Sequence, residues 1–432
     1  MIGKGRRQAK GHAGIPDAFA IRRERFKALL KGDSGGRSAL VLLFSGEERN
    51  LEPFAPDASF FYLTGVSSPS ALLLLATSPI RDTEVLLLPA TDPAKERWTG
   101  ALLSAGGLTP DCQPDPLRTA AMKATGHGAI GSFQQIEDLL QRPLREAEIV
   151  SFNFPEDTPP GHVGWAGHLA QRLRASHPHL EFRNAGRLLG DMRRIKDGDE
   201  LALMRSAMAI TDEAQRAVLR HLRPGMAEFE IQAVVEYVFK SSGAQEVAFP
   251  SIIGSGPFSC TLHYDKNRRQ TKRGDLVICD IGCRKDLYCA DVTRTYPVSG
   301  RFTRRQRAVY DTVLAAQEAA IGAARPGAFV KDVHAVATGV IADAGFAPFF
   351  FHGTSHYLGL DPHDAGSYEK PLEPGVVITV EPGIYIAAEE LGVRIEDDIV
   401  ITEDGAKRMT HSPRDPGEIE SLLGQPRRTL VV

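Results

Sequence analysis

The second half of this 432-residue chain contains an internal repeat. An Arg-Pro-Gly triplet, an amphipathic stretch and a glycine occupy residues 223–243 and recur at 325–345, 102 positions later. The segment GDLVICD at 274–280 recurs as GVVITVE at 375–381, 101 positions later. Matches in one order with nearly the same spacing favour a duplicated helix and hairpin unit. Asp280 and Glu381 therefore occupy equivalent points of two related half-domains.

The sequence before the repeat predicts a smaller α/β domain. Apolar runs at 71–76 and 84–90 predict buried strands around a turn that contains proline, and residues 177–182 predict another strand. The segment PEDTPPG at 155–161 predicts a loop. From Asp191 onward, apolar residues recur at helical spacing as far as the Arg-Pro-Gly triplet, which predicts a helix stop.

We place the domain boundary near residue 185. Residues 1–185 then form the smaller domain, with residues 1–16 as a flexible tail, and residues 186–432 form the domain with the repeat. The expected fold class is α/β, of the α+β kind, with duplicated helix and hairpin halves in the second domain.

Composition narrows the classes of partner. The net charge of −3 provides no overall field for nucleic acid or a membrane surface, and no run of about 18 apolar residues predicts a membrane span.

The five cysteines lack paired CxxC spacing, which favours free thiols in a reducing compartment. The basic amino terminus lacks the apolar run of a secretory signal, so we expect a cytoplasmic protein. A mitochondrial transit peptide is the alternative interpretation of that segment.

Each half of the repeat supplies two carboxylates from one hairpin. If the first turn centres on residues 284–286, Asp280 and Asp291 are cross-strand partners with Cβ atoms about 5 Å apart. In the second hairpin, Glu381 lies across from Glu396, with Arg394 on the same face. Carboxylates held this close repel each other unless one binds a proton or a cation lies between them. Neighbouring acids compete with Glu396, but we expect Asp397 to point to the other face and Asp398 to lie further along the strand.

Four carboxylates and one imidazole form a ligand set that suits Mn²⁺, Co²⁺, Zn²⁺ or Fe²⁺. Two ions about 3.5 to 4 Å apart, sharing Asp291 and Glu396, would activate a water for hydrolysis. The imidazole comes from HGTSHYLGLDPHD at 352–364. His352 and His356 have the spacing of a zincin helix, but Gly353 stands where that motif needs a catalytic Glu, so we expect turns or extended backbone here.

These motifs resemble the signatures of the pita-bread metallopeptidases, and among them most closely aminopeptidase P, the Xaa-Pro aminopeptidases. The resemblance covers residues 190 to 405, and SFFYLTG at 59–65 is similar to the amino domain of that family. The matching segments are TLHYDKN (261–267), DIG with Asp280, ADVTRTYPVSG with Asp291, HGTSHYLGLDPHD, VEPGIYI with Glu381 and RIEDDIVI with Glu396.

The resemblance implies a pita-bread fold, a dinuclear centre that usually holds manganese, and a homodimer or homotetramer. The implied metal ligands are Asp280, Asp291, His356, Glu381 and Glu396. The implied catalytic residues are Glu381, His263, His352, His363 and Arg394.

The implied substrate is a peptide with a free amino terminus and proline in the second position. Its scissile bond has no N–H for an ordinary exopeptidase to hold. Glu381 would take a proton from water and deliver it to the proline nitrogen, the three histidines would orient substrate and stabilise the oxyanion, and Arg394 would hold Glu396 or a neighbouring carboxylate.

Two other functions remain open. A prolidase, which cleaves only Xaa-Pro dipeptides, would use the same ligands, although prolidases more often have HGLGH where this chain has HGTSH. A non-catalytic pita-bread module that acts in binding is the remote alternative. In the amino domain, Ser59 stands where the family often has Asp. Asp57 is a candidate to replace that Asp in a contact with the free amine of the substrate. Trp98 is a candidate gate residue for a neighbouring active site.

Overall fold

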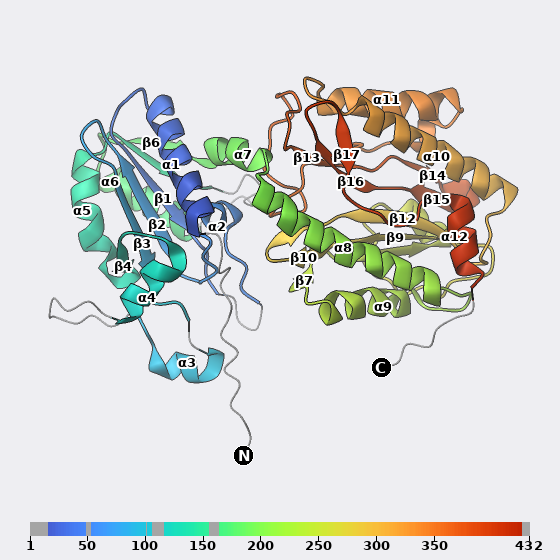
Figure 1. Cartoon of the computed structure of the whole chain (residues 1–432), viewed down its shortest axis with the longest axis horizontal. Coiled ribbons are helices and arrows are strands. Elements are labelled where there is room, and N and C mark those ends of the chain that lie inside the picture. Colours follow the sequence, from blue (N-terminus) through green and yellow to red (C-terminus); the bar gives the residue numbers. More distant parts are fainter. Residues whose placement is uncertain (1–15, 49–52, 101, 106–115, 155–163, 426–432) are drawn as a thin grey trace, which may run out of the picture. The chain divides into compact units, whose positions relative to one another are not determined.

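The computed structural model describes residues 16–48, 53–100, 102–105, 116–154 and 164–425 (Figure 1). The chain divides into two compact units, residues 1–192 and 193–432. The division lies in α7 (Gly186–Arg194), which begins directly after the boundary expected near 185. The expected loop at 155–161 and residues 1–15 of the expected tail lie outside the described residues, and Pro16 begins the first helix.

The first unit is built on a six-stranded sheet with the order β4-β3-β2-β1-β5-β6. Leu40 and Leu42 of β1 pack with leucines of α5 and α6, because alternate side chains of a strand point to the same face. The expected strands at 71–76 and 84–90 are confirmed as β2 and β3, which pair antiparallel. Its other helices and strands are α1 (Pro16–Asp33), β1 (Ala39–Phe44), α2 (Ala58–Thr64), β2 (Leu72–Thr77), β3 (Thr83–Leu88), α3 (Pro93–Thr99), α4 (Pro116–Thr125), β4 (Ile130–Ser132), η1 (Phe133–Gln135), α5 (Ile136–Glu146), β5 (Ile149–Phe152), α6 (Trp165–Ser176) and β6 (Glu181–Asn184).

The strand expected at 177–182 is wrong in its position. The structure has a turn after α6, in which the Leu180 N–H donates to the His177 carbonyl, and β6 begins only at Glu181. Pro178 lacks the N–H that a strand ladder requires, which favours the turn.

The second unit has two helix pairs and small antiparallel sheets (Figure 1). Helices α8 and α9 pack together before the hairpin with Asp280 and Asp291, the first ligand hairpin. Helices α10 and α11 pack together before the hairpin with Glu381 and Glu396, the second ligand hairpin. The expected duplication of a helix and hairpin unit is thereby confirmed. Its elements are α8 (Gly198–His221), α9 (Glu228–Ser241), β7 (Glu246–Val247), β8 (Ile252–Ser255), η2 (Gly256–Cys260), β9 (Leu276–Ile281), β10 (Cys283–Lys285), β11 (Tyr288–Cys289), β12 (Val292–Pro297), α10 (Arg304–Ala323), α11 (Val330–Asp343), η3 (Ala347–Phe349), β13 (Val377–Val380), β14 (Gly383–Ile386), η4 (Ala387–Glu389), β15 (Leu391–Arg394), β16 (Asp397–Ile401), β17 (Ala406–Arg408) and α12 (Pro416–Leu423).

The two Arg-Pro-Gly triplets form equivalent turns. Gly225 and Gly327 have φ angles of +90° and +86°, a region that glycine adopts without steric cost. Their N–H groups donate to the carbonyls of Thr271 and Leu372 at 2.8 and 2.9 Å. These acceptors are themselves 101 positions apart, so the repeat extends to the contacts of each turn.

The first ligand hairpin differs from the expected register. Strand β9 pairs with β12 so that Asp280 lies opposite Thr293, and the expected direct pairing with Asp291 is wrong. The turn centres on Asp286 and Leu287, with φ angles of 51° and 68°. Two central residues with positive φ match the twist of the flanking strands, which places the turn later than expected. Asp291 lies two residues before Thr293, so it is a diagonal neighbour of Asp280.

In the second hairpin the expected pairing agrees with the observed register. Val380 pairs with Asp397, and Gly383 pairs with Arg394. Both ladders therefore bring Glu381 opposite Glu396, at the point where β13–β16 ends and β14–β15 begins.

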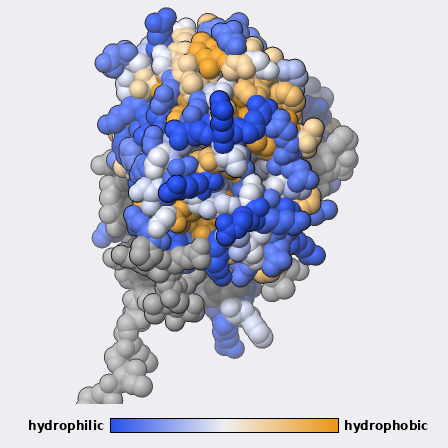
Figure 2. All heavy atoms as spheres, turned by 90° about the vertical axis from the view of Figure 1, so that its right-hand side faces the viewer, coloured by the Kyte–Doolittle hydropathy of each residue, from blue (hydrophilic) through white to orange (hydrophobic). Residues whose placement is uncertain are grey.

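Figure 2 shows a mainly hydrophilic face of the molecule, interrupted by smaller hydrophobic areas. Within the described residues, none of the helices has the length and apolar character needed to cross a membrane. Four cysteines are free thiols, as expected: Cys260, Cys279, Cys283 and Cys289. The fifth, Cys112, lies outside the described residues.

Candidate metal centre

The candidate ligands come from strand ends and one loop of the second unit. Asp280 lies near the end of β9, and Asp291 directly precedes β12. Glu381 directly follows β13, and Glu396 lies between β15 and β16. His356 is in the loop that precedes β13, where the adjacent Tyr357 forms an isolated bridge with Ile378. This irregular backbone agrees with the expectation that the histidine motif is not a zincin helix.

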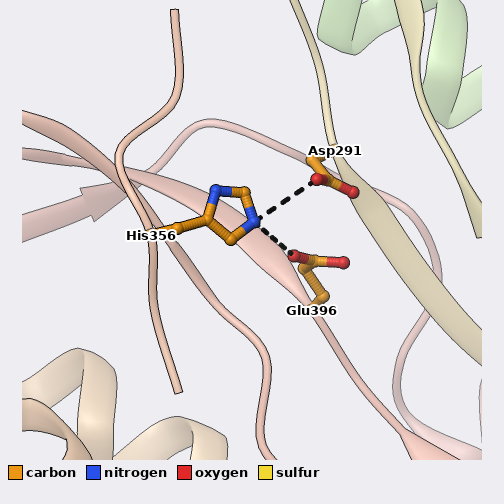
Figure 3. Close-up of side chains that lie close together, drawn as sticks. All are labelled: Asp291, His356 and Glu396. Atoms are coloured by element: carbon orange, nitrogen blue, oxygen red, sulfur yellow. Dashed lines mark ion pairs between the residues drawn. The ribbon is translucent and has the colours of Figure 1, made fainter. Parts of the chain in front are cut away.

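The imidazole of His356 points at the carboxylates (Figure 3). Its Nε2 atom lies 3.5 Å from Asp291 Oδ2, 3.6 Å from Glu381 Oε1 and 4.0 Å from Glu396 Oε1. One ligand atom from each of Asp291, His356 and Glu396 lies within 4.8 Å of the others, and all three residues are buried. Two ligands each about 2.1 Å from one ion lie at most about 4.2 Å apart, so these spacings are close to those that a divalent ion requires.

The carboxylates are short of partners and repel each other. Asp280 Oδ1, Asp291 Oδ1 and Asp398 Oδ1 are buried and have no hydrogen-bond partner among the described residues. Burial, followed by the charge of Glu396, raises the pKa values of Asp291 and Glu381 well above their usual range. Burial, followed by Asp280, raises the pKa of Glu396 to about 8. A divalent cation would relieve this repulsion, so the residues present fit a metal centre.

The Nε2 atom of His356 has a lone pair available for a metal ion. Its Nδ1 atom lies 3.1 Å from the Tyr357 carbonyl, which can only accept, so Nδ1 carries the proton and Nε2 is free to ligate. Burial, followed by the neighbouring His363, lowers the pKa of His356 to about 4. The exposed His363 ring stacks on His356 with centroids 4.2 Å apart. Burial, followed by the exposed His263, lowers the pKa of His363, and His263 also contributes to the lowered pKa of His352.

A hydrogen-bonded chain connects His352 to Asp280 through Arg394 and Tyr385. Arg394 Nη2 donates to Asp280 Oδ2 at 2.7 Å, and Nη1 donates to the Tyr385 hydroxyl at 3.0 Å. That hydroxyl lies 2.9 Å from His352 Nε2, and His352 Nδ1 lies 2.8 Å from the Gly353 carbonyl. Because the carbonyl accepts from Nδ1 and the guanidinium occupies the oxygen of Tyr385, the hydroxyl donates to Nε2. His352 is therefore neutral, and burial, followed by Arg394, lowers its pKa to about 4.

Thr293 connects the two hairpins, and the sequence did not identify it. Its hydroxyl donates to Glu396 Oε2 at 2.7 Å and accepts from Arg394 Nε at 3.2 Å. Arg394 thus holds Asp280 directly and reaches Glu396 through Thr293. The signal in the sequence was its position two residues after Asp291, on the same face of the strand.

Comparison with known proteins identifies the family of this chain. The model of metallopeptidase family M24 matches residues 202–403, and the model of the aminopeptidase P N-terminal domain matches residues 19–124. The Xaa-Pro aminopeptidase of Escherichia coli (strain K12) is 32% identical over 92% of this chain and 96% of that protein. This chain belongs to the aminopeptidase P group of metallopeptidase family M24. The predicted pita-bread fold with an aminopeptidase P-like amino domain is confirmed.

Two further comparisons refine the similarity. The structure of Escherichia coli aminopeptidase P with the inhibitor Pro-Leu has a TM-score of 0.82 and 31% identity, covering 94% of this chain and 98% of that one. The Xaa-Pro dipeptidase of Pyrococcus furiosus is 39% identical, but over only 54% of this chain and 68% of that protein. The dipeptidase therefore matches a shorter part of this M24 chain.

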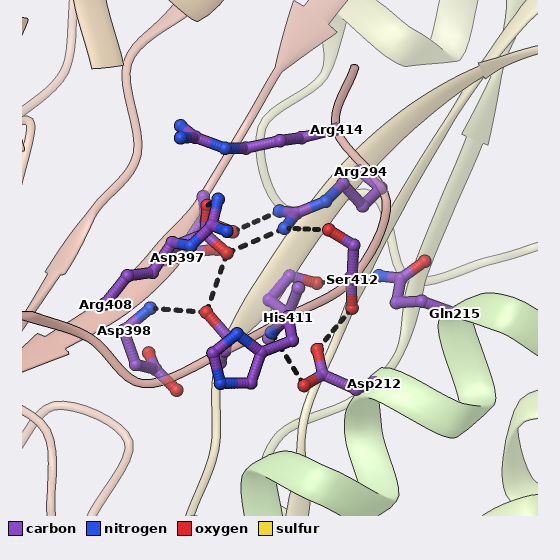
Figure 4. Close-up of polar contacts among 12 residues, drawn as sticks. Asp212, Gln215, Arg294, Asp397, Asp398, Arg408, His411, Ser412 and Arg414 are labelled. Atoms are coloured by element: carbon purple, nitrogen blue, oxygen red, sulfur yellow. Dashed lines mark hydrogen bonds and ion pairs between the residues drawn. The ribbon is translucent and has the colours of Figure 1, made fainter. Parts of the chain in front are cut away.

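A second polar network of this M24 chain includes Arg294 and Asp397, which directly follow Thr293 and Glu396 in the sequence (Figure 4). Arg294 and Asp397 are completely buried and form an ion pair of 2.6 Å. Arg294 also donates to the carbonyls of Thr293, Ser412 and Pro413 at 2.9 to 3.0 Å. The expectation that Asp397 points away from the candidate ligands is confirmed.

Three remaining aspartates of the M24 unit have structural partners. The Asp291 N–H donates to Asp398 Oδ2 at 3.2 Å, so Asp398 supports the backbone of a candidate ligand. Asp361 and Asp364 of the histidine loop both form ion pairs with Arg193, and the Asp364 side chain, which is 2% exposed, also pairs with Lys196 at 2.9 Å. These aspartates connect the histidine loop to the segment before α8.

The amino-domain candidates lie in the first unit. Asp57 caps α2, accepting from the Phe60 N–H at 2.8 Å, and Ser59 is buried in the same helix. Trp98 lies in α3 with 91% of its surface exposed. A substrate contact by these residues stays a prediction.

Proposed function

We propose that this chain is a metal-dependent Xaa-Pro aminopeptidase, an exopeptidase that releases the first residue of peptides with proline second. The observation that carries the proposal is the convergence of Asp291, His356 and Glu396 within 4.8 Å, in a chain similar over 92% of its length to a Xaa-Pro aminopeptidase. Supporting chemistry comes from the donor set, which is rich in oxygen and includes one neutral imidazole.

In this proposal, Asp280, Asp291, His356, Glu381 and Glu396 hold two divalent ions, with manganese preferred and cobalt, zinc or iron as alternatives. Bound ions of this kind lower the pKa of a water molecule and polarise a carbonyl. The spacing of 3.6 Å between Glu381 Oε1 and His356 Nε2 supports Glu381 as a member of the site.

We assign the transfer of a proton from water to the proline nitrogen to Glu381. Burial and Glu396 raise the pKa of Glu381 well above its usual range, so its carboxyl group can take a proton from water and return it to the proline nitrogen. The neutral His352 is oriented by Tyr385 and Arg394, and we assign it to substrate orientation with the exposed His263 and His363. These groups hold the substrate without needing an N–H at the scissile bond, which proline lacks.

A prolidase is the second candidate, because the dipeptidase of Pyrococcus furiosus is 39% identical to 54% of this chain. The same ligand set serves both activities, so the metal centre does not separate them. Similarity to the aminopeptidase P N-terminal domain at residues 19–124 favours the aminopeptidase.

A peptide panel tests the proposal. The protein is purified without chelator, then assayed on an Xaa-Pro dipeptide, an Xaa-Pro-Xaa tripeptide, a longer Xaa-Pro peptide and a matched peptide with alanine second. We expect cleavage of the tripeptide and the longer peptide, loss with chelator, and recovery with Mn²⁺. Activity restricted to the dipeptide would favour prolidase. A folded protein that binds no metal and gains no activity with Mn²⁺ would favour the non-catalytic module.

The cytoplasmic location stays a prediction from the cysteines and the amino-terminal sequence, and the homodimer or homotetramer stays a prediction from the resemblance to this family.

A further inference from the structure

A buried glutamine on α8 reaches both strands of the first ligand hairpin. Gln215 is completely buried, and its Nε2 donates to the carbonyls of Cys279 at 3.0 Å and Val292 at 2.9 Å. Its Oε1 accepts from the Tyr296 hydroxyl at 3.0 Å. Cys279 directly precedes the candidate ligand Asp280, and Val292 directly follows Asp291. One side-chain amide thus joins the backbone beside both carboxylates of this hairpin.

The second half of the unit repeats this arrangement from α10. Gln317 is also completely buried, and its Nε2 donates to the Val380 carbonyl at 3.2 Å and to Asp397 Oδ2 at 3.1 Å. Its Oε1 accepts from Arg414 Nη1 at 2.8 Å.

The groups that accept from the two glutamines lie at equivalent places beside the candidate ligands. Val380 directly precedes Glu381, and Asp397 directly follows Glu396, as Cys279 and Val292 flank the ligands of the first hairpin. The two glutamines are 102 positions apart, the same shift as the Arg-Pro-Gly triplets. The duplication has therefore placed one amide beside each pair of carboxylates. It binds two backbone carbonyls in the first half, and the Val380 carbonyl and the Asp397 carboxylate in the second.

We propose that Gln215 and Gln317 are positioning residues that hold the two carboxylate pairs in their metal-binding arrangement. The inference rests on the metal centre of the proposed function. Four carboxylates that converge without an ion repel one another, and strands that yield to this repulsion must be brought back together before an ion binds. An amide bonded to both strands resists that separation, so the cost of reassembling the site is lower.

The simpler explanation is that each glutamine only fastens a helix to a sheet. Gln306 on α10 is a matched control for that effect. It is buried, its Nε2 donates to the Gly274 carbonyl at 2.8 Å, and its Oε1 accepts from the Thr303 N–H at 2.9 Å. Neither partner adjoins a candidate ligand.

The test compares Gln215→Met, Gln317→Met and Gln306→Met in the full-length protein. Methionine keeps much of the side-chain length but neither donates strongly nor accepts strongly. Mn²⁺ is titrated calorimetrically into each metal-free protein at constant pH, and the melting temperature without metal is measured in parallel. We expect Gln215→Met and Gln317→Met to weaken Mn²⁺ binding by about 10- to 100-fold, the usual effect of removing a partner that supports a ligand. Gln306→Met should lower the melting temperature and leave Mn²⁺ affinity unchanged.

Equal Mn²⁺ affinities in all three variants and the wild type would overturn the inference, even if the variants melt earlier. If either methionine variant does not fold, Gln215→Asn and Gln317→Asn replace it, because they keep the amide but withdraw it by one carbon. They should show the same loss of affinity to a smaller degree, and wild-type affinity in both would equally overturn the inference. A wild-type protein that binds no Mn²⁺ would instead contradict the proposed function.

Discussion

Replacing Arg294 by methionine should strongly destabilise the second unit. The change leaves the carboxylate of Asp397 completely buried without its ion-pair partner at 2.6 Å. Thr410 and Gln317 still donate to that carboxylate at 2.7 and 3.1 Å, but the next cation is Arg408, 3.7 Å away and partly exposed. Breaking a buried pair by removing one partner costs about 3 to 5 kcal/mol. In a unit of this size, each kcal/mol lowers the melting temperature by about 2 to 4 °C, so we expect a fall of about 6 to 20 °C.

A double-mutant cycle tests the cause of this loss. Asp397→Asn removes the charge but keeps the shape and an acceptor, so Arg294→Met/Asp397→Asn should recover at least about 1 kcal/mol relative to the sum of the single variants. Urea unfolding of the metal-free proteins provides the free energies. The exposed pair Arg307–Asp311 on α10, 2.8 Å apart, is the control, and its equivalent variants should change stability by less than about 1 kcal/mol. Strictly additive effects of Arg294→Met and Asp397→Asn would refute the argument from an uncompensated buried charge.

Three further predictions concern the candidate metal centre. Glu381→Gln should keep the wild-type melting temperature and lower turnover by at least about 100-fold, measured on an Xaa-Pro-Xaa tripeptide; near-normal turnover would contradict its role in proton transfer. In the metal-free protein, the pKa of Glu396 is raised from 4.5 to about 8, so the folded state binds a proton that the unfolded chain has lost, and the stability that this provides disappears as the pH rises toward 8. Glu396 alone should then lower the free energy of unfolding by about 1 kcal/mol from pH 7 to 8, where His352 and His356 are mostly neutral in both states; urea unfolding measures it, and an unchanged value would show that no carboxyl proton is held. Tyr385→Phe removes the donor to the neutral form of His352, so its pKa should rise and the acid limb of the pH–activity profile should move to higher pH, whereas an unmoved limb would argue against this hydrogen bond.

The order and chemistry of the candidate ligands are visible along the chain because the duplication leaves a shift of 101 or 102 positions in the sequence. That shift pairs Asp280 with Glu381, and the alternation of side chains along a strand separates Asp397 from the ligand face. The register of the first hairpin was harder to predict. It depends on which two residues adopt positive φ in the turn. Neither Asp286 nor Leu287 is a glycine, the residue that would have marked that position in the sequence.

The glutamine pair illustrates a second limit. Gln215 and Gln317 have the spacing of the repeat, so a signal for them exists, but a buried glutamine in an amphipathic helix does not reveal which backbone groups it binds. Likewise, nothing local to Thr293 or Arg294 shows that one faces the carboxylates and the other lies in the second polar network.

The amino-acid sequence was sufficient for the duplicated architecture and for the order and chemistry of the candidate ligands, because these follow from periodicity and local chemistry. Only tertiary packing decided the strand register, the direction of each hydrogen bond around His352, and the burial that raises the pKa of Glu396 to about 8. These properties depend on groups far apart in the chain, and their electrostatic strength arises only when folding removes the surrounding water.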